Sequence, residues 1–313
     1  MAYFKCGSGS SEEFVKKTMN VSLPNLPFDL EEGSAVVHEG EIHVLGGSKF
    51  KTNDYAKHIK FNGTEWETVS TLPNRADTNS AVEYHGDIYL IRSNHFYKWD
   101  GVTWTELTPP YNSTSSTWKL TVYSDRIYAI GSDSTSAIYY YDGSTWTDTN
   151  KSMGSAEYRG RITSGDYIYA VGSVNNSTAL TTVTKYDANS NTFTSLTVIP
   201  YDSYKSIAEC INGELHVLGT LSRTYESVSP NTVYLYNQSF YHYVLRNNVW
   251  VRLNDVPHAC GGGASVVIDD CICVIGSGVY TYSVSSTTYS GPLTYMFGKN
   301  VTIIDKPVYE IAA

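Results

Sequence analysis

Short apolar segments recur along the chain at regular intervals, each preceded by a turn. The six segments are Ile42–Leu45, Ile88–Ile91, Ile127–Ile130, Ile168–Val171, Leu215–Leu218 and Ile272–Ile275. Pairs such as Glu39-Gly40 and Asn212-Gly213 stand before them, where glycine supplies the positive φ of a tight hairpin. No long window keeps apolar residues at helical spacing, so the pattern predicts an all-β chain built from repeats.

Two further marks occur in register with these segments. Aromatic residues flank a turn at Phe61/Trp66, Trp99/Trp104, Tyr141/Trp146, Tyr186/Phe193 and Tyr243/Trp250. An apolar residue and a proline end the unit at Leu72-Pro73, Ile199-Pro200 and Val256-Pro257, eight residues before Ala81, Ala208 and Ser265. The unit length of 39 to 57 residues suits a four-stranded propeller blade.

These marks together resemble those of the Kelch-repeat β-propellers, over about residues 20–295. The paired glycines of that family occur in full only at Gly46-Gly47, and Arg92 replaces them in the second unit. The resemblance implies a six-bladed Kelch-like β-propeller with four antiparallel strands in each blade.

Two ways of closing the ring follow from the sequence. Leu26-Pro27 stands eight residues before Ala35, which favours an outer strand for the last blade within Phe14–Pro24. The alternative is a C-terminal closure, because Tyr282 and Tyr289 repeat the aromatic spacing of Tyr186 and Phe193. With N-terminal closure we expect a flexible segment at residues 1–13, the propeller at 14–295 and a C-terminal tail at 296–313.

Composition excludes several functions. The 313 residues carry 22 Lys+Arg against 31 Asp+Glu, a net charge of −9, which argues against binding a nucleic-acid backbone. No apolar run approaches the roughly 20 residues of a membrane helix, so we expect no membrane insertion. The five cysteines lack zinc-type spacing and their number is odd, which predicts reduced thiols and no metal site.

The sequence offers little catalytic chemistry. Asp100-Gly-Val-Thr-Trp104 and Asp142-Gly-Ser-Thr-Trp146 resemble the Asp-box hairpins of sialidases, although one residue is missing from each, and a structural turn is the favoured interpretation. The arginines are scattered, and the histidines form no ligand pair at neighbouring positions. His43 and His216 take the strand position of Tyr89, Tyr128 and Tyr169, as packed residues do. We therefore expect no enzyme activity and no cofactor.

The remaining hypothesis is a binding surface on the loops around one mouth of the channel. Flat aromatic rings beside hydrogen-bonding groups suit a sugar ring or a peptide. The predicted ligand-binding residues are Arg75, Asp77, Tyr111, Trp118, Tyr158, Arg159, Tyr201, Tyr204 and His258.

The weakly charged, Ser/Thr/Asn/Tyr-rich surface and the absence of a signal peptide suggest a protein made in the cytoplasm that acts outside the cell. We therefore expect a virion-associated protein, such as a phage tail, baseplate or fibre component. Its partners would be a protein or a cell-surface glycan, and other virion proteins. The alternatives are a sialidase-like glycan hydrolase and a cytoplasmic Kelch adaptor.

Overall fold

The fold is entirely of β-strands in the ranges that the computed structural model describes. These are residues 14–28, 30, 33–47, 56–74, 80–111, 118–131, 137–152, 161–175, 178–201, 203, 206–228, 231–257, 260–280, 283–284 and 295–311. No α-helix occurs in them, which agrees with the predicted all-β class. A search of the same residues finds no helix long and apolar enough to cross a membrane.

The strands form six antiparallel sheets, which we number as blades along the chain. Blades 1 to 3 are β2–β5 (Ser34–His38, Glu41–Leu45, Lys57–Phe61, Trp66–Thr71), β6–β9 (Ser80–Tyr84, Asp87–Arg92, His95–Trp99, Trp104–Leu107) and β10–β13 (Trp118–Val122, Ile127–Gly131, Ala137–Tyr141, Trp146–Ser152). Blades 4 and 5 are β14–β17 (Arg161–Ser164, Ile168–Asn175, Thr178–Asp187, Thr192–Ser195) and β18–β21 (Ile207–Ile211, Glu214–Val228, Asn231–Arg246, Val249–Arg252). Blade 6 is β22 (Ala264–Ile268), β23 (Cys271–Tyr280), β25 (Tyr295–Ile311) and β1 (Phe14–Leu23).

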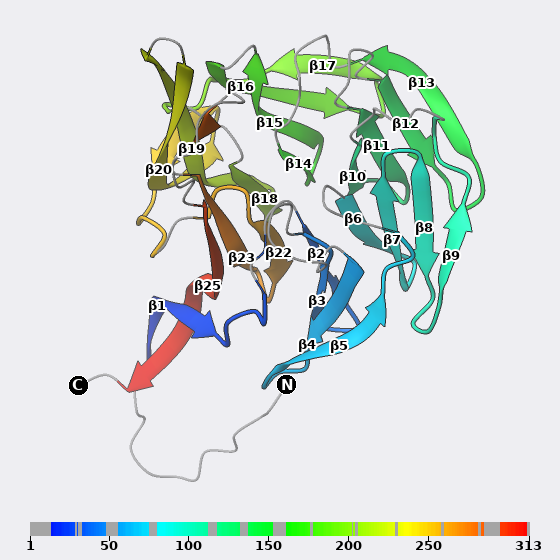
Figure 1. Ribbon diagram of the computed structural model, residues 1–313, viewed down its shortest axis with the longest axis horizontal. Coiled ribbons are helices and arrows are strands. Elements are labelled where there is room, and N and C mark those ends of the chain that lie inside the picture. Colours follow the sequence, from blue (N-terminus) through cyan, green and yellow to red (C-terminus); the bar gives the residue numbers. More distant parts are fainter. Residues whose placement is uncertain are drawn as a thin grey trace.

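The first strands of the six blades surround a common axis. Each first strand contacts those of its two neighbours, in the cyclic order β2, β6, β10, β14, β18, β22 and back to β2. Figure 1 shows these strands facing the centre, with the later strands of each blade lying outward. The sheets therefore form a closed ring, as the predicted propeller requires.

The six apolar segments are the second strands of the blades. Ile88, Ile127 and Ile168 are wholly buried, because a second strand lies between sheet neighbours and adjacent blades. The predicted turns before them have positive φ at both residues, 51° and 79° at Asn212-Gly213 for example. Gly172 follows the apolar segment Ile168–Val171 within β15 at φ 65°, and a Cβ there would collide with the carbonyl oxygen of Ser203.

Both terminal strands lie in blade 6 and close the ring. β1 pairs with β25 from Phe14↔Ile311 to Leu23↔Val301, and β25 pairs with β23. Figure 1 shows β1 and β25 side by side, next to β23 and β22. The chain then enters blade 1 through Leu26, Phe28 and Leu30, which pack in one cluster with residues of blades 1 and 6.

The expected N-terminal closing strand is confirmed, but the predicted C-terminal tail is wrong. Residues 295–311 form β25, the third strand of blade 6, which lies between β23 and β1 and pairs with both. The propeller therefore extends beyond the predicted boundary at residue 295. The expected flexible segment at residues 1–13 lies outside the described residues.

In blades 1, 2, 3 and 5 a tryptophan side chain of the outer strand joins the blade to the preceding chain. The indole N–H of Trp66 donates to the Pro24 carbonyl at 2.8 Å, that of Trp146 to Thr108 at 3.0 Å, and that of Trp250 to Thr197 at 2.9 Å. Trp104 donates instead to the Ser70 hydroxyl at 3.0 Å. These bonds cross the blade interface at the equivalent place in the four repeats.

Blade 4 makes the corresponding contact with a different residue. Phe193 stands at the tryptophan position and has no N–H to donate. Asn191, held by the Tyr186 hydroxyl at 2.8 Å, donates its amide to the Thr149 carbonyl of blade 3 at 3.3 Å. In blade 5 the predicted pair of Tyr243 with Trp250 is corrected, because the register places Leu245 opposite Trp250.

Two pairs of hydrogen-bonded histidines occupy equivalent places in blades 1 and 5. His43 Nδ1 lies 2.8 Å from His58 Nε2, and His216 Nδ1 lies 2.9 Å from His242 Nε2. Burial is the main cause that lowers the pKa of His43 to about 4 and those of His58 and His242 to about 3; it also lowers the pKa of His216. All four rings are therefore neutral at pH 7, as packed side chains.

Deletion of residues 1–23 should lower the melting temperature by many degrees, because it removes β1 and leaves the edge of β25 open. Deletion of residues 1–13 keeps β1 and serves as the matched control, with little change expected. Differential scanning calorimetry of the three proteins checks this. Equal melting temperatures for the two truncated proteins would contradict the role of β1.

Acidification from pH 7 to pH 5 should destabilise the protein. The pKa of each buried histidine is lower in the folded state than the ordinary 6.5, so the unfolded chain binds more protons between about pH 6.5 and 4. The stabilisation is thus complete above pH 6.5 and decreases on acidification, by up to about 1.4 kcal/mol per pH unit for each histidine.

The variant His58→Phe, which copies Phe96 at the same register of blade 2, should reduce this pH dependence. Replacement of the exposed His85 by Asn is the control and should preserve it. Urea unfolding at pH 7, 6 and 5 measures the three slopes. A slope for His58→Phe equal to that of the wild type would refute the assignment.

Candidate functional site: the central channel and its two mouths

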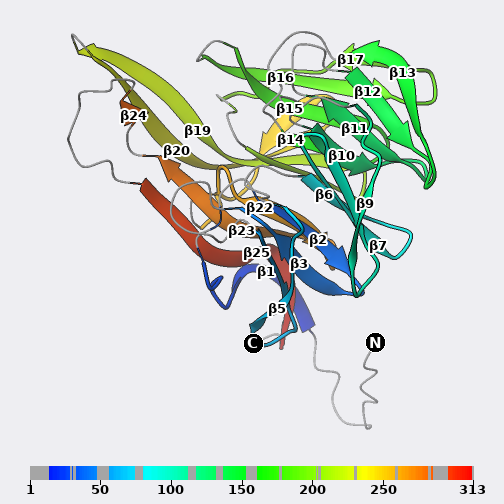
Figure 2. The ribbon, with the colours of Figure 1, turned by 45° about the vertical axis from the view of Figure 1, so that its right-hand side comes forward.

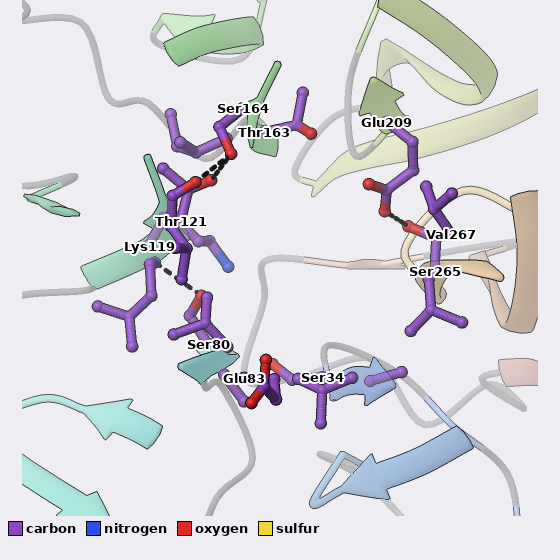
Figure 3. A pocket seen from close by; sticks show the side chains of 18 of the residues that line it. Ser34, Ser80, Glu83, Lys119, Thr121, Thr163, Ser164, Glu209, Ser265 and Val267 are labelled. Carbon is purple, nitrogen blue, oxygen red and sulfur yellow. Dashed lines mark hydrogen bonds between the residues drawn. The ribbon is translucent and has the colours of Figure 1, made fainter. Parts of the chain in front are cut away.

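A cavity of about 360 Å³ lies on the axis of the ring. Its walls are the first strands of all six blades, from Ser34–Val37 of blade 1 to Ser265–Val267 of blade 6. Figure 3 shows side chains from these strands pointing into it. Successive residues of a first strand, such as Ser80 to Glu83, all contribute to the lining, because the inner edge of each blade faces the axis.

The channel wall has two chemically different halves. Blades 6, 1 and 2 line it with valines, two of which are Val36 and Val266. Blades 3, 4 and 5 present Thr121, Thr163 and Glu209 at the equivalent register, each opposite the same position of its second strand. At this register one side of the cavity is therefore apolar and the other polar, with the carboxylate of Glu209, and Glu83 of blade 2 adds a second carboxylate to the lining.

Hydrogen bonds hold the polar residues in place. Ser265 Oγ donates to Glu209 Oε1 at 2.5 Å, across the interface of blades 5 and 6. Thr121 Oγ1 donates to Ser164 Oγ at 2.9 Å, and Ser164 donates in turn to the Val122 carbonyl. Figure 3 shows both groups on different sides of the cavity. The polar groups therefore also join adjacent blades.

The chemistry of the channel suits binding better than catalysis. Burial, with the nearby Glu209 carboxylate, raises the pKa of Cys210 to about 12, so its thiol is protonated and a poor nucleophile. Glu83 accepts a hydrogen bond from the backbone N–H of Gly86 at 2.7 Å, within its own hairpin. No arginine is among the described residues that line the cavity, whereas a sialidase site needs an arginine cluster for the substrate carboxylate.

The Asp-box-like segments form structural turns. The carboxylate of Asp142 accepts hydrogen bonds from the backbone N–H groups of Ser144 and Thr145 at 2.9 and 2.8 Å, and these bonds lower its pKa to about 2. Asp100 accepts from Val102 and Thr103 in the same way. The turn interpretation is confirmed for both segments.

Three of the nine predicted ligand-binding residues are described, and each has a different environment. Tyr111 is 49% exposed on the chain between blades 2 and 3. Tyr201 is half-buried against Tyr243, with 5.2 Å between ring centroids, and burial raises the pKa of its hydroxyl. The other six lie outside the described residues: Arg75, Asp77, Tyr158, Arg159, Tyr204 and His258.

The prediction that Trp118 contacts a ligand is wrong for its position in this structure. Its side chain is only 2% exposed, and its ring packs edge-on against Tyr139 at 5.8 Å. Trp118 is the first residue of β10. Its large ring is buried there between two blades, which is more favourable than exposing it to solvent. No ring contact joins Tyr111, Trp118 and Tyr201 within the described chain.

Long hairpins extend from one face of the ring in blades 4, 5 and 6. β15–β16 continues to Asn175↔Thr178, and β23–β25 to Tyr280↔Tyr295. The longest is the arm, which we define as Thr220–Val228 of β19 paired with Asn231–Ser239 of β20. Figure 2 shows the arm projecting from the ring, with the short strand β24 (Ser283–Val284) beside it.

Sequence reasoning missed the arm, the channel residues Glu209 and Ser265, and the histidine partners His58 and His242. The arm has a signal in retrospect, since the interval from Leu215 to Ile272 is the longest between repeats. The histidine partners stand opposite Leu45 and Leu218 on the third strands, and only an alignment of the repeats by strand register brings them together.

Comparisons with known proteins agree with this fold. A family model described as the DUF6242 β-propeller domain matches residues 16–157. Kelch repeat protein C2 of Vaccinia virus (strain Western Reserve) is 28% identical over 170 residues, which are 50% of this chain and 32% of the viral protein. The Kelch repeat protein C2 of Cowpox virus matches with the same identity and coverage. The chain thus spans about a third of the length of these curated relatives.

A solved structure, described as "Structure of YjhT", superposes with a TM-score of 0.69. It is 13% identical in sequence, and the match covers 92% of this chain and 99% of that one. At this identity the likeness concerns the fold alone. The six repeats and the closed ring of blades show that the chain is a β-propeller, and its repeats are similar to those of Kelch repeat proteins.

Proposed function

We propose that this chain is a non-catalytic recognition propeller that binds a protein partner through the face from which the arm projects. The observation that carries the proposal is the arm itself. Its nine residue pairs lie beyond the register shift between Leu218 and Thr220, and so outside the body of blade 5. At roughly 3.3 Å per residue it extends for about 30 Å.

Such an extension adds little to the stability of the ring. Ordering the backbone costs about 1–2 kcal/mol per residue, and an isolated two-stranded hairpin is marginally stable at best in water. Within the described chain, no strand pairs with the outer edge of β19 in the arm. Its backbone N–H and C=O groups are therefore available to an extended segment of a partner, by the addition of a β-strand.

The relatives support a protein partner in particular. Kelch propellers generally mediate protein binding, and the curated relatives are Kelch repeat proteins of poxviruses. The viral source of these relatives is consistent with the virion association expected from the sequence. That association remains part of this proposal. Mass spectrometry of purified particles tests this part, and absence of the chain from them would contradict it.

A sialidase-like hydrolase is the second candidate, and the described channel gives it less support. The cavity has carboxylates at Glu83 and Glu209, but no arginine is among the described residues of its wall, where a sialidase would place a cluster of them. Turnover of a fluorogenic sialoside by the wild type, abolished in Glu209→Gln, would establish this second function in place of the first.

Replacement of Thr220–Ser239 by an Asn-Gly turn should remove partner binding and leave the ring folded. The arm lies outside the blade, so the melting temperature should change by only a few degrees. Affinity for the partner should fall at least about tenfold, equivalent to about 1.4 kcal/mol. Cross-linking mass spectrometry first identifies the partner, and biolayer interferometry then compares the two proteins.

The matched control is Val102→Ser, because Val102 is 80% exposed. It lies on the turn between β8 and β9 of blade 2, on the face of the ring opposite to the arm. This variant should bind as the wild type does. A glycan array with the same three proteins tests the glycan alternative. Equal binding of the partner by the wild type and the arm-deleted protein would refute the role of the arm.

A further inference from the structure

The two histidine pairs have the same geometry but different surroundings. In each, the second-strand histidine bonds through Nδ1 to Nε2 of the third-strand histidine, at 2.8 Å in blade 1 and 2.9 Å in blade 5. The pair His43–His58 in blade 1 is covered by a side chain of blade 2. The second lines a cavity of about 220 Å³ between blades 5 and 6, separate from the channel.

A tryptophan from blade 2 covers the first pair. The Trp99 ring meets His58 edge-on, with 4.7 Å between centroids, and lies 5.5 Å from His43. Trp104 lies beyond it, 5.6 Å from His58, and its indole N–H binds Ser70, whose hydroxyl also bonds to His58. An indole ring is thus the group that this protein itself places on a histidine pair.

Blade 6 has no large ring at this position. Trp99 stands opposite Ile88, and the equivalent position of blade 6 is Ile304, one residue beyond the Cys273↔Ile303 pair. Asn20, at the register shift of β1, takes the place of Trp104. Ile304 and Ile272 line the cavity together with His216 and His242. The cavity is therefore the volume that an aromatic ring fills in the homologous interface.

We propose that the cavity between blades 5 and 6 binds a planar aromatic ring of the size of indole. About 150 Å³ of apolar cavity suffices for benzene, so 220 Å³ admits a fused ring. The hydrogen-bonded histidine pair offers the edges of two neutral rings to such a ligand, as His58 contacts Trp99 edge-on in blade 1. Asn212 and Asp270, both exposed, line the entrance.

The entrance lies at the hairpin turns that join first and second strands, Asn212-Gly213 and Asp269-Asp270. The arm leaves the opposite ends of the second strands, so this site is independent of the surface proposed for a protein partner. A metal ion is not the expected occupant. No group of three or more His, Cys, Asp or Glu residues suited to a metal occurs in the described part of the chain.

Indole titrated into the full chain tests the proposal. At about 1 mM indole should raise the melting temperature and shift the ring-proton NMR resonances of His216 and His242, while those of His43 and His58 stay in place. An absence of shifts up to the solubility limit of indole, or equal shifts of both pairs, would overturn it.

The variant Ile304→Trp restores the ring found at Trp99 and should weaken indole binding at least about tenfold. Trp99→Ile is the reciprocal variant, and indole should raise its melting temperature more than that of the wild type. Undiminished binding of indole by a folded Ile304→Trp protein would overturn the proposal; if that variant does not fold, the resonances of the wild-type histidines decide.

A second titration, with the peptide acetyl-Gly-Trp-Gly-amide, distinguishes the source of the ring. Binding of both probes to His216 and His242 supports a tryptophan side chain of a partner as the occupant. Binding of indole alone supports a small heteroaromatic molecule, because the entrance then excludes a ring carried on a peptide.

Discussion

The ring depends on hydrogen bonds that cross from one blade to the chain of the preceding blade. The hydrophobic effect between apolar faces has no direction, so it favours contact between two blades more than any one register. An indole N–H directed at one carbonyl fixes the register between blades, as Trp66, Trp146 and Trp250 do. Asn191 supplies the same donor where the chain has Phe193. The contact is thus preserved in blade 4 although the residue type changes.

Much of the fold could be predicted because the repeats carry it. Apolar second strands, turns with glycine and the aromatic pairs are local features, and six copies in register define the blade. Closure by β1 was predictable from the spacing of Leu26-Pro27. The assignment of residues 296–313 failed because β25 lacks the usual aromatic residue: Ile304 stands where the other blades have rings or Leu245.

The candidate sites were harder to predict, since they depend on register across strands distant in sequence. Glu209 and Ser265 are 56 residues apart, and their bond exists only once blades 5 and 6 are adjacent. Trp118 illustrates the opposite error. This residue begins a strand and was assigned to the loops, but the pairing Trp118↔Gly131 places it within the sheet and its ring between blades. Position along the chain could not distinguish these cases.

The pairing of β1 with β25 in blade 6 also determines the order in which the protein can fold during synthesis. Phe14 pairs with Ile311, so β1 stays unpaired until a partner almost 300 residues later in the chain has been synthesised. At about 5–20 residues per second the ribosome needs roughly 15–60 s for that distance. Blades 1 to 5 contain only strands close in sequence and can form during that time, while the unpaired first strand remains an exposed edge. A chaperone that covers a β-edge on the nascent chain would therefore act on this strand first.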